Sequence, residues 1–127
     1  MYKRQLEASS LEELFAAALE GLGELICPEA APLEERPISA EGNSPEELLV
    51  ALLSEVIFLF ETSRFIPTGG VVRALLPGKV DVLLRGETFD PAKRSPRHAV
   101  KAATYHGLRI ESEGGTGTLR ARVIFDV

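Results

Sequence analysis

Residues 119–127, which read Leu-Arg-Ala-Arg-Val-Ile-Phe-Asp-Val, decide the fold class of this 127-residue chain. Apolar side chains at the odd positions alternate with a mostly polar set at the even positions, from Arg120 to Asp126. Successive side chains of a β-strand point to opposite faces of a sheet, so the pattern predicts a strand with one face in the core and one face exposed to solvent. A solvent-exposed face is typical of antiparallel sheets, because parallel sheets are covered on both sides.

Further strands are expected upstream, where β-branched runs alternate with turn residues. We place them at residues 71–76, 79–85, 99–113 and 118–127, and the first two are joined by a tight turn at Pro77-Gly78. A short edge strand is expected around Ile38. Because the connections are short, neighbouring strands should be antiparallel.

Two helices are predicted by start signals in the first half of the chain. Residues 10–13, Ser-Leu-Glu-Glu, fit a capping box, and apolar residues then recur at steps of three and four as far as Cys27. Residues 44–47, Ser-Pro-Glu-Glu, repeat the signal, since proline suits the first helical turn. The second helix is apolar around most of its circumference, so we expect it between the first helix and a sheet. The predicted fold is a single α+β domain over residues 1–127, with an antiparallel β-sheet system packed against two α-helices.

Composition and charge exclude several classes of protein. The longest apolar run, residues 48–60, has 13 residues and is broken by Ser54 and Glu55, whereas a membrane span needs about 20. We find no signal peptide. Cys27 is the only cysteine, which excludes a disulfide framework and favours a reducing, cytoplasmic location. Residues 1–62 carry thirteen acidic and three basic side chains, whereas residues 63–127 carry six acidic and eleven basic ones. The basic half could attract phosphates or an acidic protein surface, or it could be a solvated sheet face.

Catalytic motifs are scarce in this sequence. It contains no phosphate-binding glycine loop, no nucleophile elbow and no Cys-x-x-Cys pair. His98 and His106 fall on the same predicted strand, about 26 Å apart, which is too far to share a metal ion. His106 shares a strand face with apolar residues, and we interpret it as a hydrogen-bonded core histidine.

Two candidate sites remain after this search. The side chain of Asp126 and the terminal carboxylate of Val127 could bring together two hard oxygen ligands, as calcium or magnesium prefers. Lys101 lies two residues before Ala103 and four before Tyr105 on one face of a predicted strand. From spacing alone, an exposed aspartate without a function and a solvated lysine are the simpler interpretations.

Four segments resemble the archease family, in the order that the family shows. The most specific are residues 100–108, Val-Lys-Ala-Ala-Thr-Tyr-His-Gly-Leu, and residues 120–127, Arg-Ala-Arg-Val-Ile-Phe-Asp-Val. Residues 11–15, Leu-Glu-Glu-Leu-Phe, and residues 85–91, Arg-Gly-Glu-Thr-Phe-Asp-Pro, also match. The resemblance covers nearly the whole chain from about Leu6.

The resemblance implies a non-enzymatic protein cofactor of an RtcB-type RNA ligase, which joins RNA ends during tRNA splicing and RNA repair. Archease-like proteins promote guanylylation of that ligase, which uses GTP and divalent metal, and help it through multiple turnovers. The resemblance assigns activation of the partner to Lys101 and Asp126 and metal binding to Asp126, with calcium as the expected ion. It implies the ligase as partner, indirect contact with tRNA or other RNA, and a cytoplasmic location without a membrane.

The sequence departs from the family pattern at its first residues. A second metal-holding aspartate, which the resemblance places at or just before Met1, is missing. Residues 1–5, Met-Tyr-Lys-Arg-Gln, resemble the translation of a sequencing adapter, which predicts an N-terminally truncated domain without its native first strand. A natural shorter variant is the alternative. The loss of that strand should leave an exposed sheet edge, and the loss of one of few carboxylates should weaken calcium binding.

Two other functions stay open at this point. A small metal-dependent hydrolase of phosphoesters or nucleotides would need a positioned base and a closed metal shell, and the sequence indicates neither. A direct RNA-binding module would use the basic half of the chain, where few aromatic residues are interleaved with basic ones. Tyr105 and Phe89 are the obvious candidates for stacking on bases.

Overall fold

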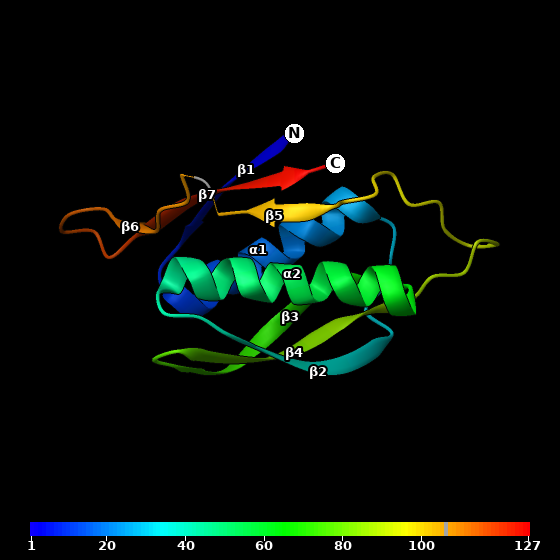
Figure 1. Ribbon diagram of the computed structural model, residues 1–127, viewed down its shortest axis with the longest axis horizontal. Coiled ribbons are helices and arrows are strands. Elements are labelled where there is room, and N and C mark those ends of the chain that lie inside the picture. The colour runs from blue at the N-terminus through cyan, green and yellow to red at the C-terminus, as the bar shows by residue number, and fades with distance from the viewer. Residues whose placement is uncertain (106) are drawn as a thin grey trace.

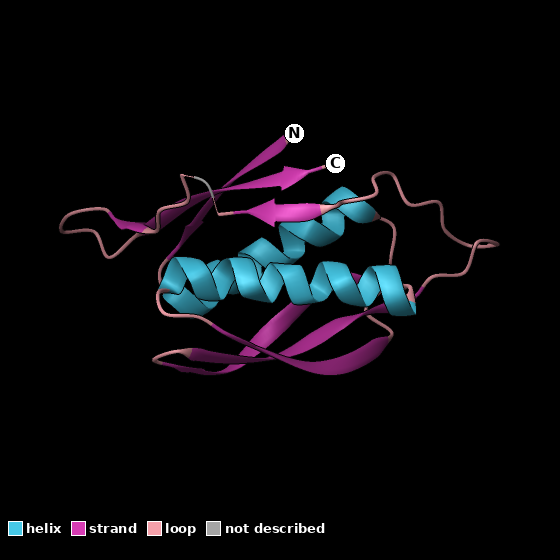
Figure 2. Cartoon of the chain, viewed as in Figure 1, coloured by secondary structure: helices cyan, strands magenta, loops and turns pink. Residues whose placement is uncertain are grey.

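Two antiparallel sheets lie on opposite sides of two helices. A computed structural model describes residues 1–105 and 107–127. In chain order the elements are β1 (Tyr2–Ala8), α1 (Leu11–Ile26), β2 (Glu34–Glu41), α2 (Pro45–Ser63), β3 (Phe65–Leu76), β4 (Lys79–Thr88), β5 (Ala102–Thr104), β6 (Glu111–Ser112) and β7 (Leu119–Asp126). The first sheet has the order β1-β7-β5, with β6 also paired to β7, and the second sheet has the order β2-β4-β3. Figures 1 and 2 show the helices as the middle layer between the two sheets.

The predicted class, α+β with two helices and antiparallel strands, is confirmed, but the strands form two sheets instead of one system. β4 is paired along both of its edges, with β2 and with β3, so no further strand can join it there. After β4 the chain passes through residues 89–101 and enters the other sheet at β5. As a result α2 contacts strands of both sheets, and not the one sheet that we expected. The edge strand expected around Ile38 is β2, which pairs with β4 over its whole length.

Both helices begin where the sequence predicts. The hydroxyl oxygen of Ser10 accepts a hydrogen bond from the backbone N–H of Glu13 at 3.1 Å, and Ser44 caps α2 in the same way. The Ser9 side chain and backbone N–H both donate to the Glu13 carboxylate and lower its pKa, so this stabilisation is present at neutral pH and is lost as the pH falls. In the described residues, neither helix is long and apolar enough to cross a membrane.

The expectation of an exposed sheet edge is wrong, whereas the interpretation of residues 1–5 as adapter-derived stays a prediction. Residues Tyr2–Ala8 form β1, which pairs with β7 from Tyr2 opposite Phe125 to Ala8 opposite Leu119. The physical reason is that Leu6 supplies an inward apolar side chain, at 5% exposure, in register with the buried Ala121. Residues 2–5 therefore take part in the fold, and they cover one edge of β7.

The prediction of a single strand at residues 99–113 is also wrong. Among the residues of this segment that the structure describes, three form β5 and two form β6. Between them the backbone N–H of Leu108 donates to the carbonyl oxygen of Tyr105 at 3.0 Å, and Gly107 has φ of 70°, which closes a turn. His98 is exposed before β5, so the estimated separation along one strand does not apply. The core role expected for His106 lies outside the described residues.

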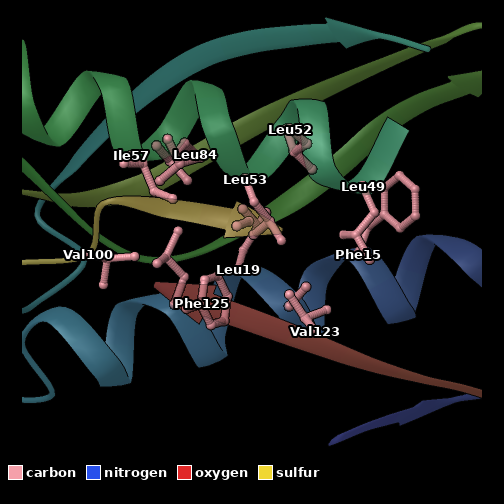
Figure 3. Packing of buried hydrophobic residues seen from close by; sticks show 14 of the residues in the cluster. Phe15, Leu19, Leu49, Leu52, Leu53, Ile57, Leu84, Val100, Val123 and Phe125 are labelled. Carbon is pink, nitrogen blue, oxygen red and sulfur yellow. The ribbon is translucent and has the colours of Figure 1, made fainter. Parts of the chain in front are cut away.

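One hydrophobic cluster joins the helices to both sheets. Figure 3 shows Val123 and Phe125 of β7 on one side of the helices, with Leu19 and Leu53 among their neighbours, and Leu84 of β4 on the other side. All five of these side chains are at most 1% exposed. Their burial removes apolar surface from water, which is the main favourable contribution to folding. β7 is therefore fixed by its inward side chains, while its outward side chains stay in solvent.

Gly86 marks a close approach between β3 and β4. It is the register partner of Pro67, and a Cβ added at Gly86 would overlap the carbonyl oxygen of Ile66. The overlapping atom belongs to the backbone of a paired strand, which cannot move without breaking ladder hydrogen bonds. The position therefore requires glycine for steric reasons.

We predict that Gly86→Ala lowers the free energy of unfolding by about 3 kcal/mol, because β3 must shift to make room for the added methyl group. Gly114→Ala is the matched control, since a Cβ at Gly114 would have no atom within 4 Å. The control should stay within about 0.5 kcal/mol of the wild type in urea denaturation. Equal effects of the two substitutions would contradict the close approach.

Candidate functional site

The end of β7 brings Asp126 and Lys101 together. The backbone N–H of Lys101 donates a hydrogen bond to the carbonyl oxygen of Asp126 at 2.7 Å. The next residue, Ala102, is the register partner of Asp126 in the β5–β7 pair. The two residues that the sequence singled out therefore share one end of the first sheet.

Both residues are exposed at this end of the sheet. Phe125 is buried and Asp126 is exposed, as strand alternation requires. Val100 and Ala103 are both buried although they are three positions apart, so the alternation slips between them and Lys101 is exposed. The backbone hydrogen bond to Asp126 thus holds an exposed lysine directly before β5. Within the described residues neither Lys101 nor Asp126 forms an ion pair, so both charges are available to another molecule.

Residues 89–101, the connection from β4 to β5, are tied to the rest of the molecule. Glu87 is 6% exposed and accepts a hydrogen bond from Nε of Arg94 at 2.5 Å. This carboxylate raises the pKa of Arg94 above its ordinary value, so the guanidinium stays charged. The backbone N–H of Arg97 donates to the carbonyl oxygen of Ile26, at the end of α1, at 2.8 Å. These contacts fix where β5 begins, and with it the position of the candidate lysine.

The metal site expected at Asp126 and Val127 is not completed by other residues. Val127 follows β7 and is 42% exposed, so it can place a second carboxylate beside that of Asp126. In the described part of the chain, no three His, Cys, Asp or Glu side chains come together to hold a metal ion. Calcium takes about six to eight oxygen ligands, and Lys101, whose backbone N–H is bonded to Asp126, offers a cationic ammonium and no oxygen. The residues present therefore fit a calcium site poorly.

The register of β1 explains why a first-strand aspartate would matter here. Tyr2 lies opposite Phe125, so the next positions along the two antiparallel strands are Met1 and Asp126. Figure 1 shows the two chain ends side by side at this edge of the fold. The position at which the resemblance expects an aspartate is thus the neighbour of Asp126, and methionine supplies no hard oxygen there.

A hollow of about 520 Å³ lies on the outer face of the same sheet. It is lined by residues of β1, β7 and the segment between β5 and β6: Gln5, Leu6, Glu7, Gly107, Arg109, Glu111, Arg120, Ala121 and Arg122. Three guanidinium groups face two carboxylates, so the lining is cationic on balance. The sequence did not reveal this hollow, because it exists only when β1 lies beside β7. The sequence feature that could have indicated a cationic surface there is the pair Arg120 and Arg122, which alternate with the apolar residues of the last strand.

The fold and this site define a class of small α+β proteins in which two antiparallel sheets enclose two helices and the last strand displays a carboxylate beside an amine. Two solved structures share the fold. An archease from Thermotoga maritima, described as a possible chaperone, has a TM-score of 0.73 at 21% identity and covers 100% of this chain and 91% of its own. A protein from Methanobacterium thermoautotrophicum has a TM-score of 0.77 at 24% identity, with coverage of 98% and 91%.

Sequence comparisons identify the family within this class. The model of the archease protein family matches residues 3–127. The protein archease of Methanopyrus kandleri is 35% identical over 113 residues, which are 85% of this chain and 81% of that protein. The protein archease of Thermoplasma volcanium is 31% identical over 121 residues, with coverage of 94% and 86%. The chain belongs to the archease family, as the resemblance predicted.

Arg94→Met should lower the midpoint of thermal unfolding more than Arg97→Met. The first substitution leaves the Glu87 carboxylate buried without a counter-charge, whereas the Arg97–Glu29 ion pair is exposed and contributes little. The double variant Glu87→Gln/Arg94→Met should recover part of the loss. Equal midpoints for the two single variants in circular dichroism would contradict the anchoring role of Arg94.

Calorimetric titration should show that this chain binds calcium with a Kd weaker than about 1 mM, because two carboxylates do not fill a calcium shell. A variant with Met1→Asp behind an added initiator methionine should bind at least about tenfold more tightly, since affinity follows ligand number and charge. Micromolar calcium binding by the unaltered chain would contradict the conclusion that its residues fit a calcium site poorly. An unchanged affinity in the variant would overturn the register argument.

Proposed function

We propose that this archease activates an RtcB-type RNA ligase, promoting guanylylation of the ligase and its multiple turnover in tRNA splicing and RNA repair. Membership of the archease family supports this role. The observation that carries it is the hydrogen bond of the Lys101 backbone N–H to Asp126, which holds a carboxylate and an amine at one exposed sheet end. The proposal places the protein in the cytoplasm with its ligase and assigns it no turnover of its own.

The two side chains have separate chemical tasks in this proposal. The Asp126 carboxylate accepts hydrogen bonds or lies near the cations that accompany the nucleotide in the ligase. The Lys101 ammonium is a compact positive charge suited to a phosphate group. Because the β5–β7 pairing already sets the spacing of their backbones, little backbone entropy is lost when they dock. An activator shifts the ligase toward its guanylylation-competent state only by binding that state more tightly.

The hydrolase alternative receives no support from the site. Such an enzyme would need several metal ligands and a positioned base around a substrate. In the described residues no group of three metal-ligating side chains comes together. The exposed end of the sheet, with the carboxylates of Asp126 and Val127 and an exposed lysine, suits contact with a larger partner better than turnover of a small substrate.

Single-turnover guanylylation of the cognate ligase with GTP measures the proposed activity. Asp126→Ala and Lys101→Ala should each reduce the stimulated rate at least about tenfold, the usual effect of losing one charge-assisted contact. Undiminished stimulation by both variants would remove the assignment of the site. Absence of stimulation by the wild type would overturn the proposed function.

Asp81→Ala and Lys79→Ala are the matched controls for this experiment. Lys79 and Asp81 are the same residue types on the other sheet, where they form a weak ion pair at 3.9 Å with side chains 49% and 44% exposed. They should leave stimulation at the wild-type level. A loss as large as that of the site variants would show that charge alone, and not this site, is read by the ligase.

A further inference from the structure

The cationic hollow on the outer face of the first sheet has no task in the proposed function. It lies between β1 and β7 and reaches the segment after β5, with a volume of about 520 Å³. The outward direction of its β1 residues is set by the opposite face, where Leu6 is buried and Arg4 pairs with Glu24 of α1 at 2.6 Å. Gln5 and Glu7 therefore face solvent.

The three arginines of the hollow differ in how they are engaged. Arg120 is held by Glu7 at 2.8 Å and by Glu113 at 3.3 Å, and Glu111 is its register partner. The carboxylates of the hollow thus gather around this one guanidinium. Arg109 and Arg122 form no ion pair within the described residues, and both are exposed.

A guanidinium presents a planar fork of donors that matches the oxygens of a phosphate group. Arg122 lies opposite Gln5, which adds an uncharged side-chain amide to this end of the hollow. The hollow therefore offers the guanidinium groups of Arg109 and Arg122 and an amide donor, and the β1 partner of Arg122 is uncharged.

Positive charge continues from the hollow toward the end of β7. Lys3 is exposed and lies opposite Ile124, between the positions of Arg122 and Asp126 on the same face. Lys101 is exposed, and its backbone N–H is bonded to the carbonyl oxygen of Asp126. Arg122 and Asp126 are four residues apart in one strand, which is about 13 Å. This cationic track, made of Arg109, Arg122, Lys3 and Lys101, has the length of a few nucleotides of single-stranded RNA.

We propose that the cationic track binds the phosphate groups of single-stranded RNA without reading its bases. None of the described residues that line the hollow is aromatic, so they offer a mononucleotide no stacking partner. A strand of linked phosphates gains from each cation along the track and releases counterions at each. Asp126 repels phosphate at the end of the track, so the RNA leaves the sheet at that point. The inference goes beyond activation of the ligase and concerns the chain alone.

Fluorescence anisotropy of a labelled single-stranded RNA of about ten nucleotides tests this inference with the purified chain. Arg109→Gln/Arg122→Gln should weaken binding at least about tenfold at low salt and reduce the slope of log K against log salt by about 1.4, because two phosphate contacts are lost. Neither ligase nor GTP is present. The result is therefore independent of whether the chain activates the ligase.

The matched control is Arg73→Gln/Lys93→Gln, which removes the same charge from exposed positions outside the track. It should retain wild-type affinity, and thermal unfolding should show that both double variants are folded. Absence of salt-dependent binding by the wild type, or an equal loss in the control, would overturn the inference. So would displacement of RNA by GTP or by poly-glutamate at equal charge concentration, since the site would then suit a nucleotide or an acidic protein.

Discussion

Pairing of β7 along both of its edges is the constraint on which the rest of the molecule depends. β1 lies along one edge, and β5 and β6 lie along the other. The inward side chains, Val123 and Phe125, are buried against the helices and fix the register. A slip of one residue would turn this apolar set to solvent, so the register is strongly specified. The same register sets Lys101 beside Asp126 and Gln5 beside Arg122.

The parts of the fold that depend on local signals could be predicted from the sequence. Both helices begin at a serine cap because capping involves residues only a few positions apart. The alternation in residues 119–127 likewise predicted the core face of β7. Non-local pairing could not be read in this way. Residues 2–5 carry no strand signal of their own, and they form a strand because β7 offers a free edge.

The candidate site was predictable only in part, for the same reason. Asp126 and Lys101 were singled out in the sequence and given roles by family resemblance, but their contact depends on the pairing of β5 with β7, which no local pattern indicates. The hollow was missed because its lining combines Gln5 with Arg122, which are distant in sequence. The structure also shows where part of the uneven charge of the chain lies. Both helices carry acidic side chains and no basic ones, whereas the outer face of the first sheet carries the cationic track.

Amide hydrogen exchange at Lys101, followed by NMR in the free protein, tests most directly whether the end of β7 holds this residue. The backbone N–H of Lys101 donates a hydrogen bond to the carbonyl oxygen of Asp126. Its exchange should therefore be at least about tenfold slower than in an unstructured peptide. Exchange at the rate of an unstructured peptide would contradict the account, because the amine and the carboxylate would then share no fixed position.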